Sequence, residues 1–218
     1  MHIVDRSVML VESFLKAYGP TTIKKYFWER EYSSTKWDFA DDTSGDCVYS
    51  HLERYSKDGA ILDMGCGSGN TANEMAETSY QSYLGVDISE EALTKAAKRS
   101  KENGRQDKNH FECADIMHYV PTGKFDVILF RESMYHVPIN KIKATLDRYA
   151  AFLKDNGVLI VRLFASNRAV AQSKDKPRPA AMLRLMESEF DVVEKGRYDA
   201  IPGRPTVLVL RTGKGLAQ

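Results

Sequence analysis

One short stretch limits the fold of this chain more than any other: AILDMGCGSGN, residues 60–70. A short apolar run ends at Asp63, and glycine then stands at every second position, at 65, 67 and 69. Glycine can adopt positive φ and has no Cβ to obstruct a ligand. A glycine-rich turn at the carboxyl end of a strand forms a floor on which an extended ligand can lie against backbone. The stretch therefore predicts a strand–turn–helix unit of an α/β sheet, with a ligand site at the turn.

The spacing of the glycines separates two kinds of ligand site. A dinucleotide-binding turn reads G-x-G-x-x-G and would need glycine at position 70, where this chain has Asn70. The pattern here is D-x-G-x-G-x-G, from Asp63 to Gly69. An NAD-binding module therefore remains an alternative that this spacing disfavours.

The rest of the chain alternates between strand and helix patterns, which indicates a mostly parallel sheet. We expect strands at about 60–63, 83–87, 109–112, 125–130 and 157–164, with helices over 70–79, 90–102 and 139–154. Ser89 is expected to start the second of these helices. A helix near 178–189 and two strands, around 190–194 and 205–211, predict an antiparallel hairpin at the sheet edge.

The residues before the first strand read as helices. Apolar residues at helical spacing (Val8, Val11, Leu15, Tyr18) predict a helix over residues 1–18. Thr21 or Thr22 is expected to cap a second helix, which carries Ile23, Tyr26, Phe27 and Trp28, and a third spans about Cys47 to Tyr55. We expect residues 1–57 to form a helical lid over a ligand-binding domain of residues 58–218.

Two further carboxylates stand at predicted strand ends. Asp87 ends the second strand, where an acid can accept hydrogen bonds from both hydroxyls of a ribose, and Ile88 can then pack on the adjoining base. Alternatively, Asp87 only caps the next helix. Asp115 follows the third strand, where it can accept a hydrogen bond from an adenine amino group while Ile116 packs on the ring. Alternatively, Asp115 is a surface turn residue. The segment after the fourth strand, FRESMYHV (130–137), should also face the ligand, because sites in open sheets lie beyond the strands' carboxyl ends.

With these signals in register, the chain resembles the class I S-adenosylmethionine (SAM) methyltransferases, in particular the small-molecule type 11/12 group, firmly over about residues 58–165. The resemblance implies a Rossmann-like, seven-stranded, mostly parallel sheet with a reversed last strand and helices on both faces. It implies SAM as the cofactor and a methyl acceptor at oxygen or nitrogen of a small molecule. The implied cofactor-binding residues are Asp63, Gly65, Cys66, Gly67, Gly69, Asn70, Asp87, Ile88, Asp115, Ile116, Phe130 and Arg131.

Catalytic and lid residues come from two other segments. His136 has the residue type and place of a general base, with Glu132 as a second candidate, although a histidine here can equally be a packing residue. Trp28 and Tyr32 resemble the W-x-x-x-Y segment that closes over SAM in relatives, and aromatic faces attract a sulfonium. These rings could instead pack the added helices on the sheet, and Trp37 and Phe39 share that ambiguity.

The composition of the chain limits the classes of partner that we expect it to bind. The net charge of +1 provides no overall field for nucleic acid, and no apolar run approaches the roughly 20 residues of a membrane span. Three separated cysteines fit a reducing cytoplasm, and no metal site is expected, since His110, Cys113 and His118 are loosely spaced. An RNA or protein substrate, or a non-catalytic SAM-binding protein, remains an alternative, and the oligomeric state stays open.

Overall fold

The structure is a computed structural model that describes residues 11–34, 43, 45–164 and 179–212. The predicted positions Val8, Trp37 and Phe39 lie outside the described residues. Residues 11–18 are helical. The further elements in chain order are α2 (Thr21–Tyr32), α3 (Val48–Ser56), β1 (Ala60–Met64), α4 (Asn70–Glu74), η2 (Glu77–Ser79), β2 (Ser82–Asp87), α5 (Glu90–Glu102), β3 (Asn109–Cys113), β4 (Phe125–Arg131), η3 (Met134–His136), η4 (Ile139–Lys141), α6 (Ile142–Ala150), β5 (Leu153–Phe164), α8 (Pro179–Glu189), β6 (Asp191–Arg197) and β7 (Pro205–Arg211).

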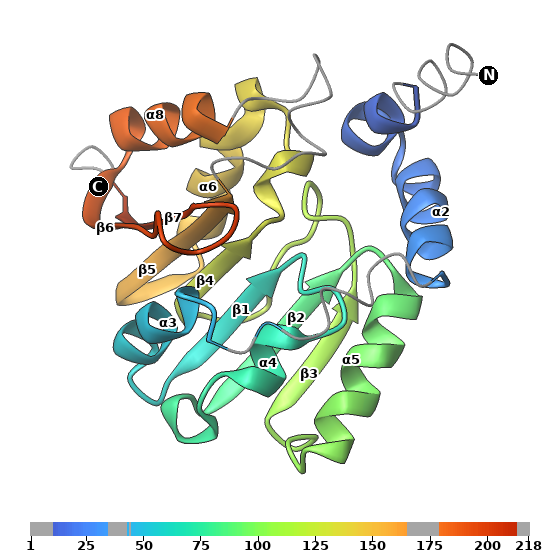
Figure 1. Cartoon of the computed structure of the whole chain (residues 1–218), viewed down its shortest axis with the longest axis horizontal. Coiled ribbons are helices and arrows are strands. Elements are labelled where there is room, and N and C mark those ends of the chain that lie inside the picture. Colours follow the sequence, from blue (N-terminus) through green and yellow to red (C-terminus); the bar gives the residue numbers. More distant parts are fainter. Residues whose placement is uncertain (1–10, 35–42, 44, 165–178, 213–218) are drawn as a thin grey trace.

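The strands form one seven-stranded sheet in the order β3-β2-β1-β4-β5-β7-β6 (Figure 1). The pairs from β3 to β5 are parallel, whereas β7 is antiparallel to both of its neighbours, β5 and β6. The predicted Rossmann-like sheet with a reversed last strand is therefore confirmed. The strand order reverses between β1 and β4, so the loops that follow these two strands diverge at the point where open α/β sheets bind ligands.

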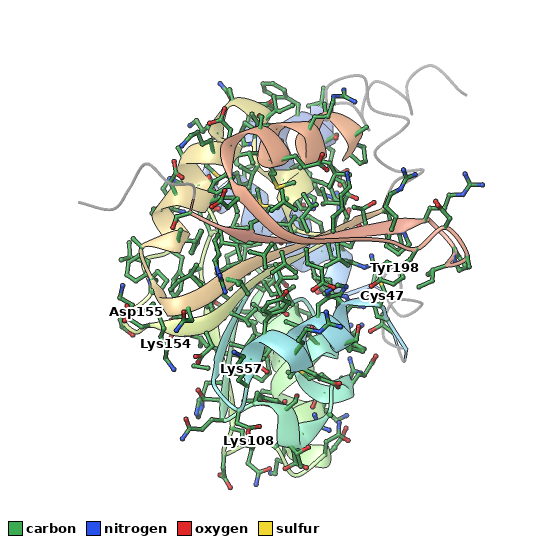
Figure 2. The ribbon with its side chains drawn as sticks, turned by 90° about the vertical axis from the view of Figure 1, so that its left-hand side faces the viewer. Cys47, Lys57, Lys108, Lys154, Asp155 and Tyr198 are labelled. Carbon is green, nitrogen blue, oxygen red and sulfur yellow. The ribbon has the colours of Figure 1, made fainter. Side chains whose placement is uncertain are left out.

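Both faces of the sheet are covered, because the buried strands carry apolar side chains on both sides. One face packs with α6 and α8, through side chains such as Tyr149 and Met182, around Leu208 of β7. The other face packs with α3 and α4, through Leu52 and Ala72. Figure 2 shows α8 and α3 on opposite sides of the β6–β7 pair. In the same view Cys47 and Tyr198 lie at the other side of the molecule from Lys154 and Asp155, near the start of β5.

Two predicted helices are too long. The helix expected over 139–154 is a 3-10 turn followed by α6, which ends at Ala150, and β5 already begins at Leu153. Leu153 pairs with Phe125 and the register then shifts, so that Val127 pairs with Val158. The helix expected over 70–79 ends at Glu74. The guanidinium of Arg105 binds the carbonyls of Ala72 and Met75, at 3.1 and 2.9 Å, and so satisfies groups at the end of the helix.

The N-terminal part of α2 also differs from expectation. Pro20 is the N-cap, without a side-chain capping bond, so the prediction that Thr21 or Thr22 caps the helix was wrong. The buried residues of α2 are Lys24 and Glu31, whereas Ile23 and Tyr26 are 37% and 62% exposed. Helix α2 therefore turns a charged side toward the protein. It stands beyond the start of α5, near the carboxyl ends of β1 and β2 (Figure 1).

Candidate active site

The glycine turn after β1 is enclosed by two other segments. Gly65 and Gly67 have φ of 82° and 54°, in the left-handed region that favours glycine. A Cβ on Gly67 would lie 2.7 Å from the Tyr32 hydroxyl of α2, and one on Gly65 would lie 2.6 Å from the Ser133 Cβ after β4. Both glycines are therefore required by conformation and by close approach.

The turn is tied to the end of β2 through Asp87. The amide of Gly65 donates to the Val86 carbonyl at 2.7 Å, and the amide of Gly67 donates to Asp87 Oδ2 at 2.9 Å. Asp87 Oδ1 accepts from the Ser89 amide at 3.0 Å, and Ser89 is the N-cap of α5, as predicted. Burial raises the pKa of Asp87, against the lowering effect of these amides. The structure thus brings Asp87 to the turn while it also bonds the start of the helix.

A second carboxylate lies at the end of β1. Asp63 is 1% exposed, and its Oδ2 accepts a 2.6 Å hydrogen bond from the Tyr83 hydroxyl. Within the described part of the chain, Oδ1 has no hydrogen-bond partner. Burial raises the pKa of Asp63 to about 6, although the Tyr83 hydroxyl and the charge of Arg131 lower it. A buried oxygen of this kind suits a cationic or N–H-bearing group.

The third carboxylate, Asp115, is held by α2. Its Oδ2 accepts from the Thr21 hydroxyl at 2.9 Å and from the Lys24 ammonium at 3.2 Å, and its Oδ1 accepts from the Met117 amide at 2.9 Å. Burial would raise the pKa of Asp115, but the Met117 amide and the Lys24 charge bring it below its ordinary value. The neighbouring Ile116 is partly buried, and its carbonyl accepts from Arg148 and Tyr149. Asp115 is therefore not a free surface turn residue.

Arg131 belongs to a buried network of charges at the ends of β4 and β5. It pairs with Asp46 at 2.8 Å, and Asp46 also pairs with Arg162 at 3.0 Å. Arg162 pairs in turn with Glu132 at 2.6 Å. The side chains of Asp46 and Arg162 are only 6% and 4% exposed. The network fixes the start of the loop that follows β4.

Glu132 is held in an unusual way. Its φ of 57° lies in the left-handed region, which is costly for a residue other than glycine and is often found at functional sites. One carboxylate oxygen binds Arg162, while the other, Oε2, is buried without a hydrogen-bond partner among the described residues. Burial raises the pKa of Glu132 to about 7, against the lowering charge of Arg162.

The two aromatic residues predicted in the lid contact both sides of this region. The ring of Trp28 meets that of His136 edge-on, with centroids 4.8 Å apart, and lies 6.2 Å from the ring of Tyr32. The Tyr32 carbonyl accepts from the Lys95 ammonium of α5 at 2.7 Å. Helix α2 therefore joins the glycine turn to the loop after β4.

The structure also describes the surroundings of four other predicted residues. Phe130 is fully buried and packs edge-on against Tyr149 of α6, at 5.4 Å. Asn70 accepts a hydrogen bond from Arg99, and Cys66 is buried against Gly85. Ile88 is half-buried before α5. The sequence reasoning did not single out Asp46 or Ser133, and it read Thr21 only as a cap. Asp46 had no motif to mark it, whereas Ser133 adjoins the predicted Glu132.

The described residues hold neither a metal-binding cluster nor a helix that could cross a membrane. No three His, Cys, Asp or Glu side chains there are grouped as they would be to bind a metal ion. None of the described helices combines the length and the apolar character that crossing a membrane requires.

The sequence of this chain is similar to those of known methyltransferases. The family described as "Methyltransferase domain" matches residues 61–157. The 27-O-demethylrifamycin SV methyltransferase of Amycolatopsis mediterranei is 37% identical over 36% of this chain and 29% of its own length. The protein-lysine N-methyltransferase EFM4 of Saccharomyces cerevisiae is 25% identical over 63% of this chain and 72% of its own. The chain spans less than half the length of most of the curated relatives it matches.

Among solved structures, the N-methyltransferase NodS of Bradyrhizobium japonicum, in complex with S-adenosylhomocysteine, superposes with a TM-score of 0.69. The alignment covers 87% of this chain and 98% of NodS at 16% identity, so it shows a common fold. Residues 61–157 thus match a methyltransferase domain, and the chain shares its fold with a solved SAM-dependent methyltransferase. The resemblance indicated by the sequence motifs is confirmed.

Proposed function

We propose that this protein transfers a methyl group from SAM to an oxygen or nitrogen atom of a small-molecule acceptor. The observation that carries the proposal is the glycine turn, which is tied to Asp87 by the Gly67 amide and lies between α2 and the loop after β4. The matched methyltransferase domain supports the reaction. Among the proteins similar to this chain, the name of the ubiquinone biosynthesis O-methyltransferase of Idiomarina loihiensis states O-methylation, and the name of NodS, which has the same fold, states N-methylation.

The residues around the turn fit SAM. Asp63 offers a buried oxygen that lacks a partner among the described residues, and Arg131 provides a nearby positive charge, which together suit the ammonium and carboxylate of the methionine part. Asp87 would bind the ribose, and Asp115 with Ile116 the adenine. Trp28 and Tyr32 present aromatic rings that suit a sulfonium. When bound, SAM supplies a methyl group already activated for transfer, so the protein has mainly to orient the acceptor.

An acceptor that must lose a proton needs a base, and Glu132 fits this role better than His136. The Glu132 Oε2 atom is buried without a partner in the described part of the chain, and burial raises its pKa to about 7, close to the value that suits a base at neutral pH. His136 instead packs against Trp28. We therefore assign proton removal to Glu132 and a wall of the acceptor site to His136.

Calorimetry with S-adenosylhomocysteine, SAM and NAD tests the cofactor. We expect binding of the first two, and Asp87→Ala should weaken S-adenosylhomocysteine at least about tenfold, because hydrogen bonds to a charged group are lost. Asp107→Ala, which removes an exposed carboxylate, is the matched control. No binding of S-adenosylhomocysteine at millimolar concentration by the folded protein would contradict the proposal. A tritiated-methyl screen of metabolites, RNA and proteins would separate a small-molecule acceptor from a macromolecular one.

A further inference from the structure

The first turn of α2 covers the carboxylate expected to recognise adenine. Thr21 and Lys24, which lie on one side of that turn, both donate to Oδ2 of Asp115. The side chains of Lys24 and Asp115 are 9% and 2% exposed. This is a buried ion pair between residues far apart in sequence, one in the N-terminal helix and one beyond β3.

Those contacts leave little of Asp115 for a ligand. A carboxylate oxygen has about two lone-pair positions, and two donors already occupy Oδ2. Oδ1 accepts from the Met117 amide. Both oxygens of Asp115 thus already accept hydrogen bonds from the protein, and both side-chain donors to Oδ2 come from the first turn of α2, so an amino group can take their place only when this turn withdraws.

The second half of α2 is anchored separately. The Glu29 carboxylate accepts from the amides of Glu90 and Glu91 at 2.7 and 3.1 Å, at the start of α5, where the helix dipole favours an anion. The Tyr32 carbonyl accepts from Lys95. These bonds anchor the half of α2 that carries Trp28 and Tyr32, whereas Thr21 and Lys24 lie in the first turn, at the other end of the helix.

We propose that the first turn of α2 is an autoinhibitory contact, in which Thr21 and Lys24 occupy Asp115 and must withdraw before Asp115 can accept the amino group of adenine. This inference rests on the proposed function. Binding of the adenosyl group exchanges one set of donors to Asp115 for another, so the intramolecular pair lowers the apparent affinity for the cofactor. Lys24 therefore opposes cofactor binding, although it lies beside the site.

The sign of the effect of Lys24 on cofactor affinity tests the proposal. We expect Lys24→Met to bind S-adenosylhomocysteine roughly tenfold more tightly in calorimetry, because a competing hydrogen bond to a charged group is removed. The ligand-free variant should melt at a lower temperature, because Asp115 loses its buried partner. Thr21→Val, a milder change, should act in the same direction. The control is Lys25→Met, which removes a surface pair with Glu90 and should change the affinity less than about twofold.

The measured affinities separate failure of the autoinhibitory contact from failure of the proposed function. Unchanged or weaker affinity in both Lys24→Met and Thr21→Val would overturn the autoinhibitory contact, since Lys24 would then be neutral or part of the binding site. Failure of the wild type and of all variants to bind S-adenosylhomocysteine would instead refute the proposed function. Stopped-flow measurement adds a second readout: association should be faster in Lys24→Met, and equal association rates would count against a contact that must be displaced.

Discussion

Replacement of Asp63 by asparagine should stabilise the protein at neutral pH. Asp63 is 1% exposed, and its pKa is raised from 3.8 to about 6, mainly by burial. The folded state therefore binds this proton more tightly than the unfolded state. The wild type has the resulting stability in full below pH 3.8 and loses it as the pH rises to about 6. One pKa unit is about 1.4 kcal/mol, so the loss amounts to about 3 kcal/mol.

The amide side chain introduced by Asp63→Asn cannot ionise, so the variant escapes this loss. The amide oxygen can still accept the hydrogen bond that Tyr83 donates to Asp63. The difference in unfolding free energy between Asp63→Asn and the wild type should therefore grow by about 2–3 kcal/mol between pH 4 and pH 7.5. Urea unfolding followed by circular dichroism, at steps of half a pH unit, measures this difference.

Two results would refute the reasoning on Asp63. A difference that stays constant across this range would mean that the carboxyl titrates alike in both states, and a difference that shrinks would mean that its pKa is lowered in the folded protein. Tyr83→Phe provides the matched test of the partner. Loss of its hydroxyl should cost more in the wild type at pH 7.5 than in the Asp63→Asn background, because the bond to an ionised group is the stronger one.

Two other predictions concern the loop after β4. If Glu132 removes the proton, the rate of methyl transfer should fall as the pH is lowered through about 7. In pH–rate profiles, Glu132→Gln should abolish this pH dependence and reduce turnover at least about 100-fold, whereas His136→Ala should keep the dependence. The reverse pattern would assign the base to His136. Asp46→Asn should lower the free energy of unfolding by about 3–5 kcal/mol in chemical denaturation, because Arg131 and Arg162 lose a shared buried partner; a loss below about 1 kcal/mol would show that the two arginines are solvated.

Much of the sheet was predictable because its signals are local. The apolar run to Asp63, the alternate glycines and the run to Asp87 each depend on residues close in sequence, and the bounds expected for β1 and β2 agree with the structure to within one residue. The helix ends were less predictable, because distant partners decide them. Arg105 donates hydrogen bonds to carbonyls at the end of α4. After α6 the chain becomes a strand, in which Leu153 pairs with Phe125.

The position of the candidate site in the sheet could also be predicted. Residues at the carboxyl ends of parallel strands meet at one edge, so Asp87 could be assigned to the glycine turn in advance, and the Gly67 amide bonds it. Nothing local indicated that Asp46 would join two arginines, or that Glu132 would have a left-handed backbone. These contacts join segments that only the folded chain brings together.

The sequence by itself determined the fold class, the glycine turn and the order of the carboxylates, because strand and helix periodicity and the backbone freedom of glycine are properties of neighbouring residues. Only the tertiary structure decided which side of α2 is buried. Its apolar residues Ile23 and Tyr26 remain exposed, while Lys24 and Glu31 turn inward. The reason is electrostatic: buried charges need partners, and the partner of Lys24 is Asp115, on a segment far along the chain.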